Sequence, residues 1–595
     1  MNAFSVPPSP GTPANQLFGR CFAGYQCWFR AGEDPDESWG HWSHRYSPEE
    51  GNYHPEMYPD FADFPDTSLY PCRMPPYPDG SPARFYNGHD PAVIDVHYRW
   101  LAEYGVDGLA IQRFFGATSA EEQPEPTHLT AIREAAEKYG RLFYVMYDTS
   151  GCGRAGDAFL PRMQGDVIRN IEGKGLIASP ACAHVGDRPV ICIWGLSPLE
   201  KGRYPAAADA LAFIQWLKER GYYVIGGLPD NGWAEETGEY AAVYGALDMI
   251  SPWTPGRFRK ETLDAWIGDH LQRDLTYCKA HGKDYQPVMF AGFAWSNFGG
   301  GGNPNCTPRD AGRFLWAQAK HYARAGVQAG YFAMFDEFDE GTALAKTASD
   351  SFGLPGTRLY AQTQAVDGWW LSSDFYLRLA GAVTALLRGE RSLTEEVPVP
   401  HSEGPVYWRN GFELREAAYT LTRGEAADSR PRRVDVCDAH PLVLSQEAVQ
   451  LETAAVVRGQ RGLVCYTGCC GFAFSGIGMN AGRCHVVYRL ALTDIPVTEG
   501  LTLSYRMRAV NEGGGFVHPD LILEDGSLLS AHLPALLEEQ VEKDFWGHYL
   551  WKKVTHRLPA SLAGRRITGV AVAYDRPGEA RFAAYIDDII IEKEN

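Results

Sequence analysis

Residues 330–342 read GYFAMFDEFDEGT, and this stretch decides how the rest of the sequence is interpreted. Its first half is a short apolar run, which is typical of a strand buried on both faces. Its second half places four carboxylates within five residues before a Gly-Thr pair. A solvated acidic loop tip is the ordinary interpretation of such a cluster. Like charges repel, however, and the position of these acids at the end of a predicted strand favours a functional role.

Strand-like runs alternate with helix-like patterns from Cys21 to about residue 390. We expect eight strands, at 21–29, 108–114, 142–148, 189–195, 222–227, 248–253, 286–293 and 330–337. Helices are expected between them, among others at 91–104, 126–139, 261–281, from Thr307-Pro308 onward, and at 373–389. This alternation predicts an α/β fold, a (β/α)8 or TIM barrel. A doubly wound open sheet is the alternative, but no glycine-rich phosphate-binding turn follows the first strand.

After residue 390 the helical periodicity ends and short β-rich runs appear between Gly, Pro and Asp turns. We therefore predict two domains, a catalytic barrel at 15–390 and an antiparallel, jelly-roll-like β-sandwich at 391–595. The second domain is expected to resemble a carbohydrate-binding module that either binds glycan or stiffens the barrel. The pair Asp587-Asp588 within it is a candidate structural Ca²⁺ site, with an ordinary polar turn as the alternative.

The composition excludes several classes of partner. The 595 residues carry a net charge of −19, which argues against nucleic acid and anionic membranes as partners. No apolar run reaches the roughly 18 residues that a membrane span needs, and residues 1–8 lack the features of a secretory signal. We expect a cytoplasmic protein, with an exported form whose signal was removed as the alternative; the odd count of 13 Cys suits reduced thiols. The oligomeric state is not indicated.

Reactive side chains of a (β/α)8 barrel project from the C-terminal ends of its strands. The residues at or near these ends carry aromatic, amide, guanidinium and carboxylate groups, which suit a carbohydrate-binding cleft. The candidate substrate-binding residues are Tyr25, Trp28, Gln112, Arg113, Asp148, Trp194, Trp253, Trp295, Asp336 and Asp339. Alternatives remain for some of them. Arg113 forms a salt bridge to the acids of the eighth strand, Asp148 caps a helix, or the indoles of Trp253 and Trp295 pack in the core.

Glu337 and Glu340 are the candidate catalytic residues. Hydrolysis of a glycosidic bond with retention uses two carboxyl groups about 5–5.5 Å apart. A spacing of three residues in a turn brings Cβ atoms to about 5–6 Å. We expect mutual repulsion to raise the proton affinity of one glutamate, so that one group acts as acid and the other as base.

The segment DEFDEGT at 336–342 resembles the motif Asn-Glu-Trp-His-Glu-Gly-Thr of the endo-α-mannosidases of glycoside hydrolase family 99 and their relatives. The resemblance covers about residues 15–390 and implies a (β/α)8 barrel and hydrolysis with retention. It also implies that Glu337 deprotonates the sugar 2-hydroxyl, through an epoxide-like intermediate, and that Glu340 is the general acid/base. Asp336, Phe338 and Asp339 depart from the motif and leave the mannose specificity and endo action open.

Three functional hypotheses follow. The first is a retaining glycoside hydrolase that acts on an α-linked glycan or glycoside. The second is a non-catalytic glycan-binding protein on a glycosidase scaffold. The third is a metal-dependent hydrolase, which is weakened because the acids lack an obvious set of histidine partners. We therefore expect a carbohydrate substrate, no catalytic metal and no cofactor apart from the candidate Ca²⁺.

Overall fold

The computed structural model describes residues 16–594 except 37–38, 44–45, 50–51, 78–79, 119–126, 155–158, 200–201, 230–231, 299–304, 356–360, 368, 411–431, 438–456, 459–463, 467–471, 479–482 and 578–579. The chain forms two compact units. The first comprises Met1–Pro75, Pro82–Lys346 and Tyr376–Val399, and the second comprises Pro76–Ser81, Thr347–Phe375 and Pro400–Asn595. The predicted domain boundary at 390/391 stays a prediction.

The first unit is built on a sheet of parallel strands, which lie in the order β10-β9-β8-β7-β5-β4-β1-β12-β11. These strands are β1 (Cys21–Tyr25), β4 (Gly108–Phe114), β5 (Leu142–Asp148), β7 (Arg188–Trp194), β8 (Tyr223–Leu228), β9 (Met249–Pro252), β10 (Asp284–Tyr285), β11 (Val288–Met289) and β12 (Gly330–Phe332). Most of their residues are buried on both faces, as expected for parallel strands covered by helices.

The two ends of this strand order belong to one chain segment. β10 pairs with β9, and β11 pairs with β12. Only residues 286 and 287 separate β10 from β11, and both stay bonded to the neighbouring strands. The Gln286 N–H donates to the Ile250 carbonyl at 2.9 Å, and the Tyr331 N–H donates to the Pro287 carbonyl at 3.0 Å. The sheet is therefore consistent with the predicted (β/α)8 arrangement.

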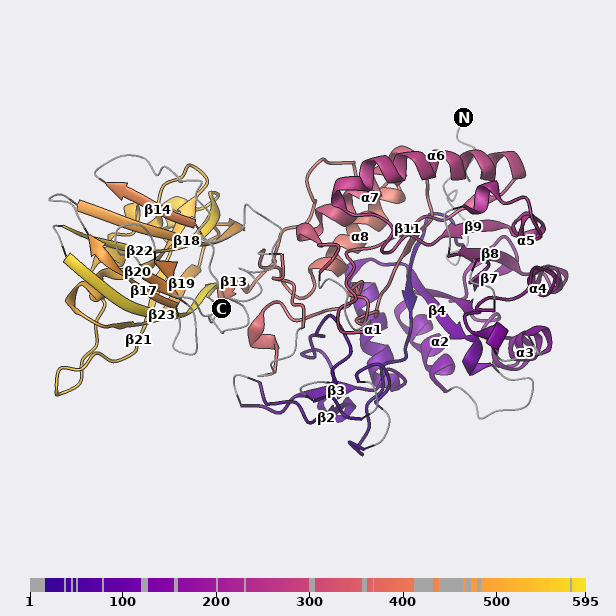
Figure 1. Ribbon diagram of the computed structural model, residues 1–595, viewed down its shortest axis with the longest axis horizontal. Coiled ribbons are helices and arrows are strands. Elements are labelled where there is room, and N and C mark those ends of the chain that lie inside the picture. The colour runs from indigo at the N-terminus through magenta and orange to yellow at the C-terminus, as the bar shows by residue number, and fades with distance from the viewer. Residues whose placement is uncertain are drawn as a thin grey trace. The chain divides into compact units, whose positions relative to one another are not determined.

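Helices cover the outside of this sheet (Figure 1). They are α1 (Pro91–Tyr104), α2 (Thr127–Tyr139), α3 (Phe159–Asp166), α4 (Ala207–Glu219), α5 (Tyr240–Ala246), α6 (Leu263–His281), α7 (Arg313–Arg324) and α8 (Phe375–Leu387). The bounds of α1 match the prediction because its ends are fixed locally. Asp90 accepts a hydrogen bond from the Ala92 N–H, and Gly105 ends the helix with a left-handed φ of 77°.

The segment between β1 and α1 is packed rather than open. It contains a short antiparallel pair, β2 (Leu69–Pro71) and β3 (Arg84–Tyr86). The side chains of Trp39 and Trp42 within it are almost completely buried, and Trp42 donates from Nε1 to the Tyr86 carbonyl at 2.8 Å. A short antiparallel strand, β6 (His184–Val185), pairs with β7.

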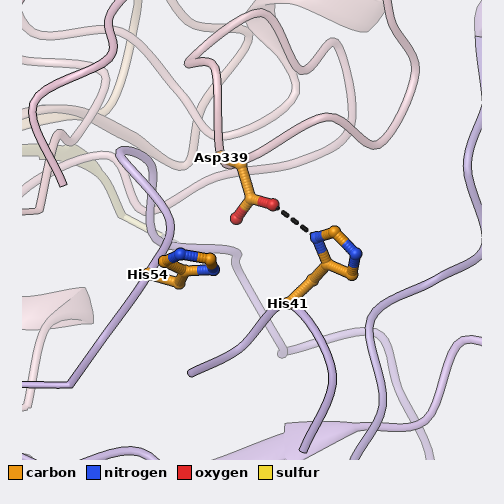
Figure 2. A group of neighbouring side chains, drawn as sticks. All are labelled: His41, His54 and Asp339. Carbon is orange, nitrogen blue, oxygen red and sulfur yellow. Dashed lines mark hydrogen bonds and ion pairs between the residues drawn. The ribbon is translucent and has the colours of Figure 1, made fainter. Parts of the chain in front are cut away.

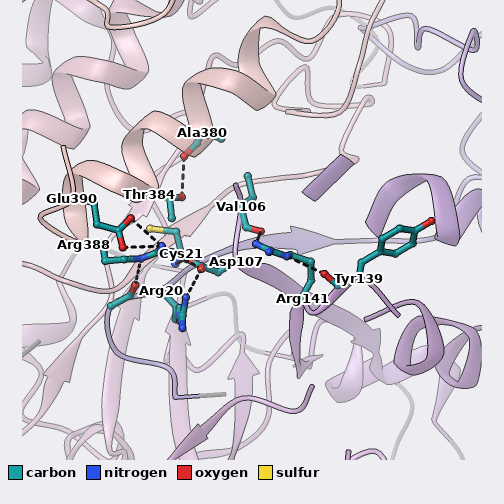
Figure 3. A network of polar contacts seen from close by, with 11 residues as sticks. Arg20, Cys21, Val106, Asp107, Tyr139, Arg141, Ala380, Thr384, Arg388 and Glu390 are labelled. Atoms are coloured by element: carbon teal, nitrogen blue, oxygen red, sulfur yellow. Dashed lines mark hydrogen bonds and ion pairs between the residues drawn. The ribbon is translucent and has the colours of Figure 1, made fainter. Parts of the chain in front are cut away.

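At the N-terminal ends of the parallel strands, Asp107 is the centre of a polar network (Figure 3). Its carboxylate accepts hydrogen bonds from Arg20 Nη1 at 3.0 Å, from Arg388 Nη2 at 2.5 Å and from the Cys21 N–H at 2.9 Å. These partners lie next to β1 and just after α8. One buried carboxylate thus joins the first strand, β4 and the last helix of the unit.

The second unit contains two antiparallel sheets, with orders β15-β16-β17-β23-β19-β21 and β14-β18-β22-β20; β13 also pairs with β23. The strands are β13 (Val406–Asn410), β14 (Arg432–Cys437), β15 (Val457–Arg458), β16 (Val464–Tyr466), β17 (Phe472–Gly478), β18 (Arg483–Pro496), β19 (Leu501–Ala509), β20 (Val517–Leu523), β21 (Lys552–Arg557), β22 (Arg566–Pro577) and β23 (Ala580–Lys593). One apolar cluster includes residues of both sheets, among them Leu503, Val570 and Ile589. The predicted β-rich region is confirmed, whereas its jelly-roll-like sandwich topology stays a prediction.

Among the described helices, none combines the length and apolar character needed to cross a bilayer. The expected cytoplasmic location stays a prediction. In the pair proposed for Ca²⁺, Asp588 Oδ2 lies 3.2 Å from Arg506 Nε. The candidate Ca²⁺ site likewise stays a prediction.

Candidate active site

The acid cluster, defined here as Asp336, Glu337, Asp339 and Glu340, follows β12 rather than ending it. The sequence predicts a strand as far as residue 337, but β12 ends at Phe332. Beyond it the Phe335 N–H donates to the Gly24 carbonyl of β1 at 2.7 Å, which bends the chain across the end of the first strand. The acids therefore lie on a turn at the C-terminal edge of the sheet.

Asp336 ties this turn to the end of β1. Its Oδ1 accepts from the Gln26 N–H at 2.7 Å, and its Oδ2 accepts from the Cys27 N–H at 2.8 Å. Burial raises the pKa of Asp336 to about 7, although the two N–H donors act in the opposite direction. Both carboxylate oxygens are used inside the protein, so Asp336 does not line the cavity, unlike the predicted substrate-binding role.

Glu337 is held by one oxygen and exposes no more than 2% of its surface. Gln26 Nε2 donates to its Oε2 at 2.8 Å. The other oxygen, Oε1, is buried and has no hydrogen-bond partner among the described residues. The pKa of Glu337 lies well above its ordinary value, mainly because of burial and then because of the other three carboxylates of the acid cluster.

Asp339 and Glu340 complete the acid cluster. Asp339 is almost fully buried, and its Oδ2 lies 2.7 Å from His41 Nδ1. Burial raises the pKa of Asp339 well above its ordinary value. Glu340 is half-buried, and its pKa rises to about 7 because of burial and then the charge of Asp339. Repulsion was the predicted cause of such a shift; burial is the larger one.

A cavity of about 660 Å³ lies in front of Glu337 and Glu340. Six of the predicted substrate-binding residues line it: Trp28, Gln112, Asp148, Trp194, Trp253 and Trp295. They lie at or near the C-terminal ends of different strands, so the topology brings together residues that are far apart in the sequence. The walls are largely aromatic, because Phe114, Tyr204, Phe293 and Phe298 also line the cavity.

Tyr25 and Arg113 do not line this cavity, which corrects the prediction for both. The Tyr25 hydroxyl is fully buried and lies 2.9 Å from His97 Nδ1. Arg113 binds Asp166 of α3 through Nε and Nη2, each at 2.5 Å. The alternative prediction that Arg113 forms a salt bridge is therefore confirmed. Its partner, however, is Asp166 and not one of the acids after β12.

Asp148 lies in the cavity wall and does not cap a helix. Its Oδ1 accepts from the Ser150 N–H at 2.8 Å, which closes a local turn. Burial raises the pKa of Asp148 above its ordinary value. Trp194 and Trp253 contact each other edge to face, with ring centroids 5.8 Å apart. Both indoles are half-buried and border the cavity, so they are not simply core residues.

Glu56 is a site residue that the sequence did not reveal. Its backbone N–H donates to the Phe338 carbonyl at 2.9 Å. Its buried carboxylate accepts from Ser296 Oγ at 2.8 Å and from the Asn297 N–H. Burial raises the pKa of Glu56 above its ordinary value. Glu56 therefore joins the turn of the acid cluster to the loop after β11. No local pattern in the sequence indicated this contact.

Gln26, His41 and His54 also belong to the site. Gln26 follows the predicted residue Tyr25 and orients Glu337, so its position just beyond a strand end was an available signal. His41, His54 and Asp339 each offer a ligand atom, and these atoms lie within 4.8 Å of one another. The acids thus do have histidine neighbours, contrary to the expectation from the sequence.

Comparison with known proteins gives limited similarity. No family model and no curated protein match the chain. Among solved structures, a family 99 endo-α-mannosidase from Bacteroides thetaiotaomicron is 16% identical with a TM-score of 0.45, over 64% of this chain and 100% of that one. A glycoside hydrolase-like protein is 11% identical with a TM-score of 0.38, over 64% and 99%. A β-mannanase from Streptomyces thermolilacinus is 15% identical with a TM-score of 0.31, over 50% and 86%.

The structural neighbours include the family that the motif resembles. TM-scores below 0.5 at these identities assign neither a family nor an activity to the chain. The argument for function therefore rests on the geometry of the site.

Proposed function

We propose that the protein is a retaining glycoside hydrolase that acts on an α-linked glycan or glycoside. The observation that carries the proposal is the position of Glu337 and Glu340 together in the wall of a 660 Å³ cavity lined by tryptophans. Two carboxyl groups facing one cavity are the groups that glycosidic bond cleavage uses. Indole rings supply flat apolar faces for sugar rings.

The contacts of Glu337 support its role as the base that takes the proton of the sugar 2-hydroxyl. Glu337 lines the cavity, Gln26 fixes its Oε2, and its Oε1 is buried without a partner among the described residues. An acceptor oxygen that is oriented but not engaged is what a hydroxyl donor needs. The 2-oxygen would then displace the leaving group and form the epoxide-like intermediate that the family resemblance implies.

Glu340 is proposed as the general acid/base. It is half-buried and lines the cavity, so it reaches both substrate and water. In the first step it protonates the leaving-group oxygen. In the second it takes a proton from the water that attacks the anomeric carbon, the bond from that carbon to the 2-oxygen breaks, and Glu337 returns its proton to the 2-oxygen, so that the configuration is retained. Asp336 and Asp339 do not line the cavity. Asp336 positions the turn, and Asp339 is held by His41.

A screen of aryl α- and β-glycosides, with the anomer of the product read by NMR, tests the proposal. We expect hydrolysis of an α-glycoside with retention. The corresponding 2-deoxy glycoside should be inert, because it lacks the hydroxyl on which Glu337 acts. Binding without hydrolysis by the parent protein and by Glu337→Gln and Glu340→Gln would instead favour the glycan-binding alternative.

We also propose that the region 391–595 binds glycan. The side chains of Phe545 and Trp546 are 92% and 79% exposed, and a hydrogen-bonded loop presents them. In this loop Asp544 accepts from the N–H groups of Trp546 and His548, at 2.9 and 2.8 Å. We expect the Trp546→Ala variant to bind an insoluble polysaccharide more weakly than the wild type in a pull-down assay. Its hydrolysis of aryl glycosides should be unchanged.

A further inference from the structure

Two histidines and one aspartate from two separate loops converge beside the cavity. His41 lies in the loop after β1, His54 lies further along that loop, and Asp339 follows β12. Figure 2 shows the two imidazole rings and the carboxylate directed towards one another. One ligand atom from each residue lies within 4.8 Å of the other two.

The carboxylate of Asp339 is only half satisfied. Its Oδ2 takes the contact with His41 Nδ1, whereas Oδ1 is buried and has no partner among the described residues. No lysine or arginine in the described part of the chain forms an ion pair with Asp339. A buried carboxylate oxygen without a partner is costly, and a cation between Asp339 and the two imidazoles would satisfy it.

We propose that His41, His54 and Asp339 bind one divalent first-row transition metal ion, Zn²⁺ in the first instance. Two imidazole nitrogens and one carboxylate oxygen form a donor set that suits such ions, whereas Mg²⁺ and Ca²⁺ prefer oxygen ligands. In tetrahedral geometry, bonds of about 2.0–2.2 Å place donor atoms roughly 3.4 Å apart. Ligand atoms that lie up to 4.8 Å apart without an ion therefore reach this spacing through side-chain shifts of about 1 to 1.5 Å.

The histidines provide access to the ion. Both are only partly buried, so solvent reaches these side chains, and three protein ligands would leave a fourth position for water. This arrangement of three protein ligands and one open position is that of metal sites that exchange their fourth ligand.

The ion would lie directly behind the cavity wall. The His41 ring stacks on Trp28, with centroids 3.7 Å apart and planes 6° apart. The His54 ring lies 4.5 Å from that of Phe298. Trp28 and Phe298 both line the cavity. A bound ion would fix these two aromatic walls relative to the turn that carries Glu337 and Glu340, which makes its role one of positioning.

Calorimetric titration of the chelator-treated full-length protein with ZnCl₂ tests this site. We expect one Zn²⁺ per chain, with no competition from Mg²⁺. In His54→Ala the affinity should fall at least ~10-fold, and His41→Ala should behave alike. The matched control is His321→Ala. His321 also contacts an aspartate, Asp264 at 2.8 Å, but among the described residues this pair is not part of a group that could hold a metal ion.

Substitution with Co²⁺ gives a second readout that needs no activity. The wild type should show the visible absorption of Co²⁺ bound by nitrogen and oxygen ligands, and His54→Ala should lose it while its far-UV circular dichroism is unchanged. Absence of stoichiometric binding in the wild type overturns the proposal. Equal affinity in wild type, His54→Ala and His41→Ala also overturns it. Because neither readout involves hydrolysis, failure here is distinguishable from failure of the proposed function.

Discussion

Buried carboxylates have opposite surroundings at the two ends of the parallel strands. At the N-terminal ends of the strands, Asp107 is bound by two arginines, Arg20 and Arg388, and by a backbone N–H. At the C-terminal edge the four carboxylates of the acid cluster have no ion pair with lysine or arginine among the described residues. His41 contacts Asp339 Oδ2 at 2.7 Å, but burial lowers the pKa of His41 to about 4.

This difference indicates that Asp107 stabilises the fold, whereas the acid cluster serves proton transfer. A buried charge with complete partners helps to hold a fold together, and removing one partner is expensive. Buried acids without such partners have raised pKa values instead, and proton exchange at neutral pH becomes available to them. In (β/α)8 barrels the C-terminal edge carries the reactive groups, and the opposite edge serves stability. The four predictions below test this division.

The largest effect is expected for the glutamates of the cavity. Glu340→Gln should lower kcat/KM about 10³-fold for a substrate with a poor leaving group, and much less for a dinitrophenyl glycoside, which needs no protonation. Glu337→Gln should lower both alike, because its role does not depend on the leaving group. Neither substitution should lower the free energy of unfolding, since glutamine keeps the shape of the side chain and each change removes one carboxyl group from a crowded cluster. Denaturant unfolding and steady-state kinetics check both points; a stability loss with unchanged kinetics would contradict them.

The opposite result is expected at the other end of the barrel. Asp107→Asn should lower the free energy of unfolding by about 2 kcal/mol, below the 3–5 kcal/mol of fully buried pairs because its arginines are partly exposed. The kcat of the folded protein should not change. The control is Asp95→Asn, which breaks an exposed pair with Lys138 and should cost less than about 1 kcal/mol. Equal effects of the two substitutions in urea unfolding would refute the comparison.

The aromatic wall should affect binding more than turnover. Trp253→Ala should raise KM about fivefold with a smaller change in kcat, because it removes a stacking face worth about 1 kcal/mol. Trp216→Ala, on the outer helix α4 and beneath Arg220, removes an indole that does not line the cavity and should leave KM unchanged. If Trp253→Ala lowers the free energy of unfolding without changing KM, the indole of Trp253 packs in the core and does not bind substrate.

A buried acid away from both ends provides the smallest effect. Burial raises the pKa of Asp274 in α6 to about 6, although Arg273 contacts it at 2.8 Å. An aspartate is half-protonated near pH 3.9 when unfolded, so its protonated form stabilises the fold below about pH 4, and this contribution is lost as the pH rises through about 6. The stability of the wild type relative to Asp274→Asn should therefore fall by on the order of 1 kcal/mol between pH 4 and 7. The free energy of unfolding is measured with denaturant for the wild type and for Asp274→Asn. If the difference between them does not change with pH, the pKa of Asp274 is not raised.

The sequence predicted those parts of the fold that local residues determine. The bounds of α1 followed from Asp90 and Gly105, and β4 and β5 were located to the residue from their apolar runs. The short length of β12 could not be predicted, because the bend after it depends on the bond from Phe335 to Gly24, more than 300 residues away.

The same limit applies to the site. Strand ends indicated the cavity residues because in a parallel barrel those ends meet at one edge. Whether a side chain at such an end points into the cavity depends on a partner elsewhere. Arg113 turns away because Asp166 of α3 binds it, and Tyr25 turns away towards His97. Glu56 and His54 lie on a long segment without periodic pattern, so only the folded chain shows what they contact.

The Asp107 network also affects when this unit folds during synthesis. The hydrogen-bond donors to Asp107 come from residues 20, 21 and 388, and residue 388 emerges from the ribosome long after residue 20. Until Arg388 has left the exit tunnel, the nascent barrel lacks the contact that joins its first strand to its last helix. Folding of this unit is therefore expected to be completed late in synthesis, when most of its sequence has already left the ribosome.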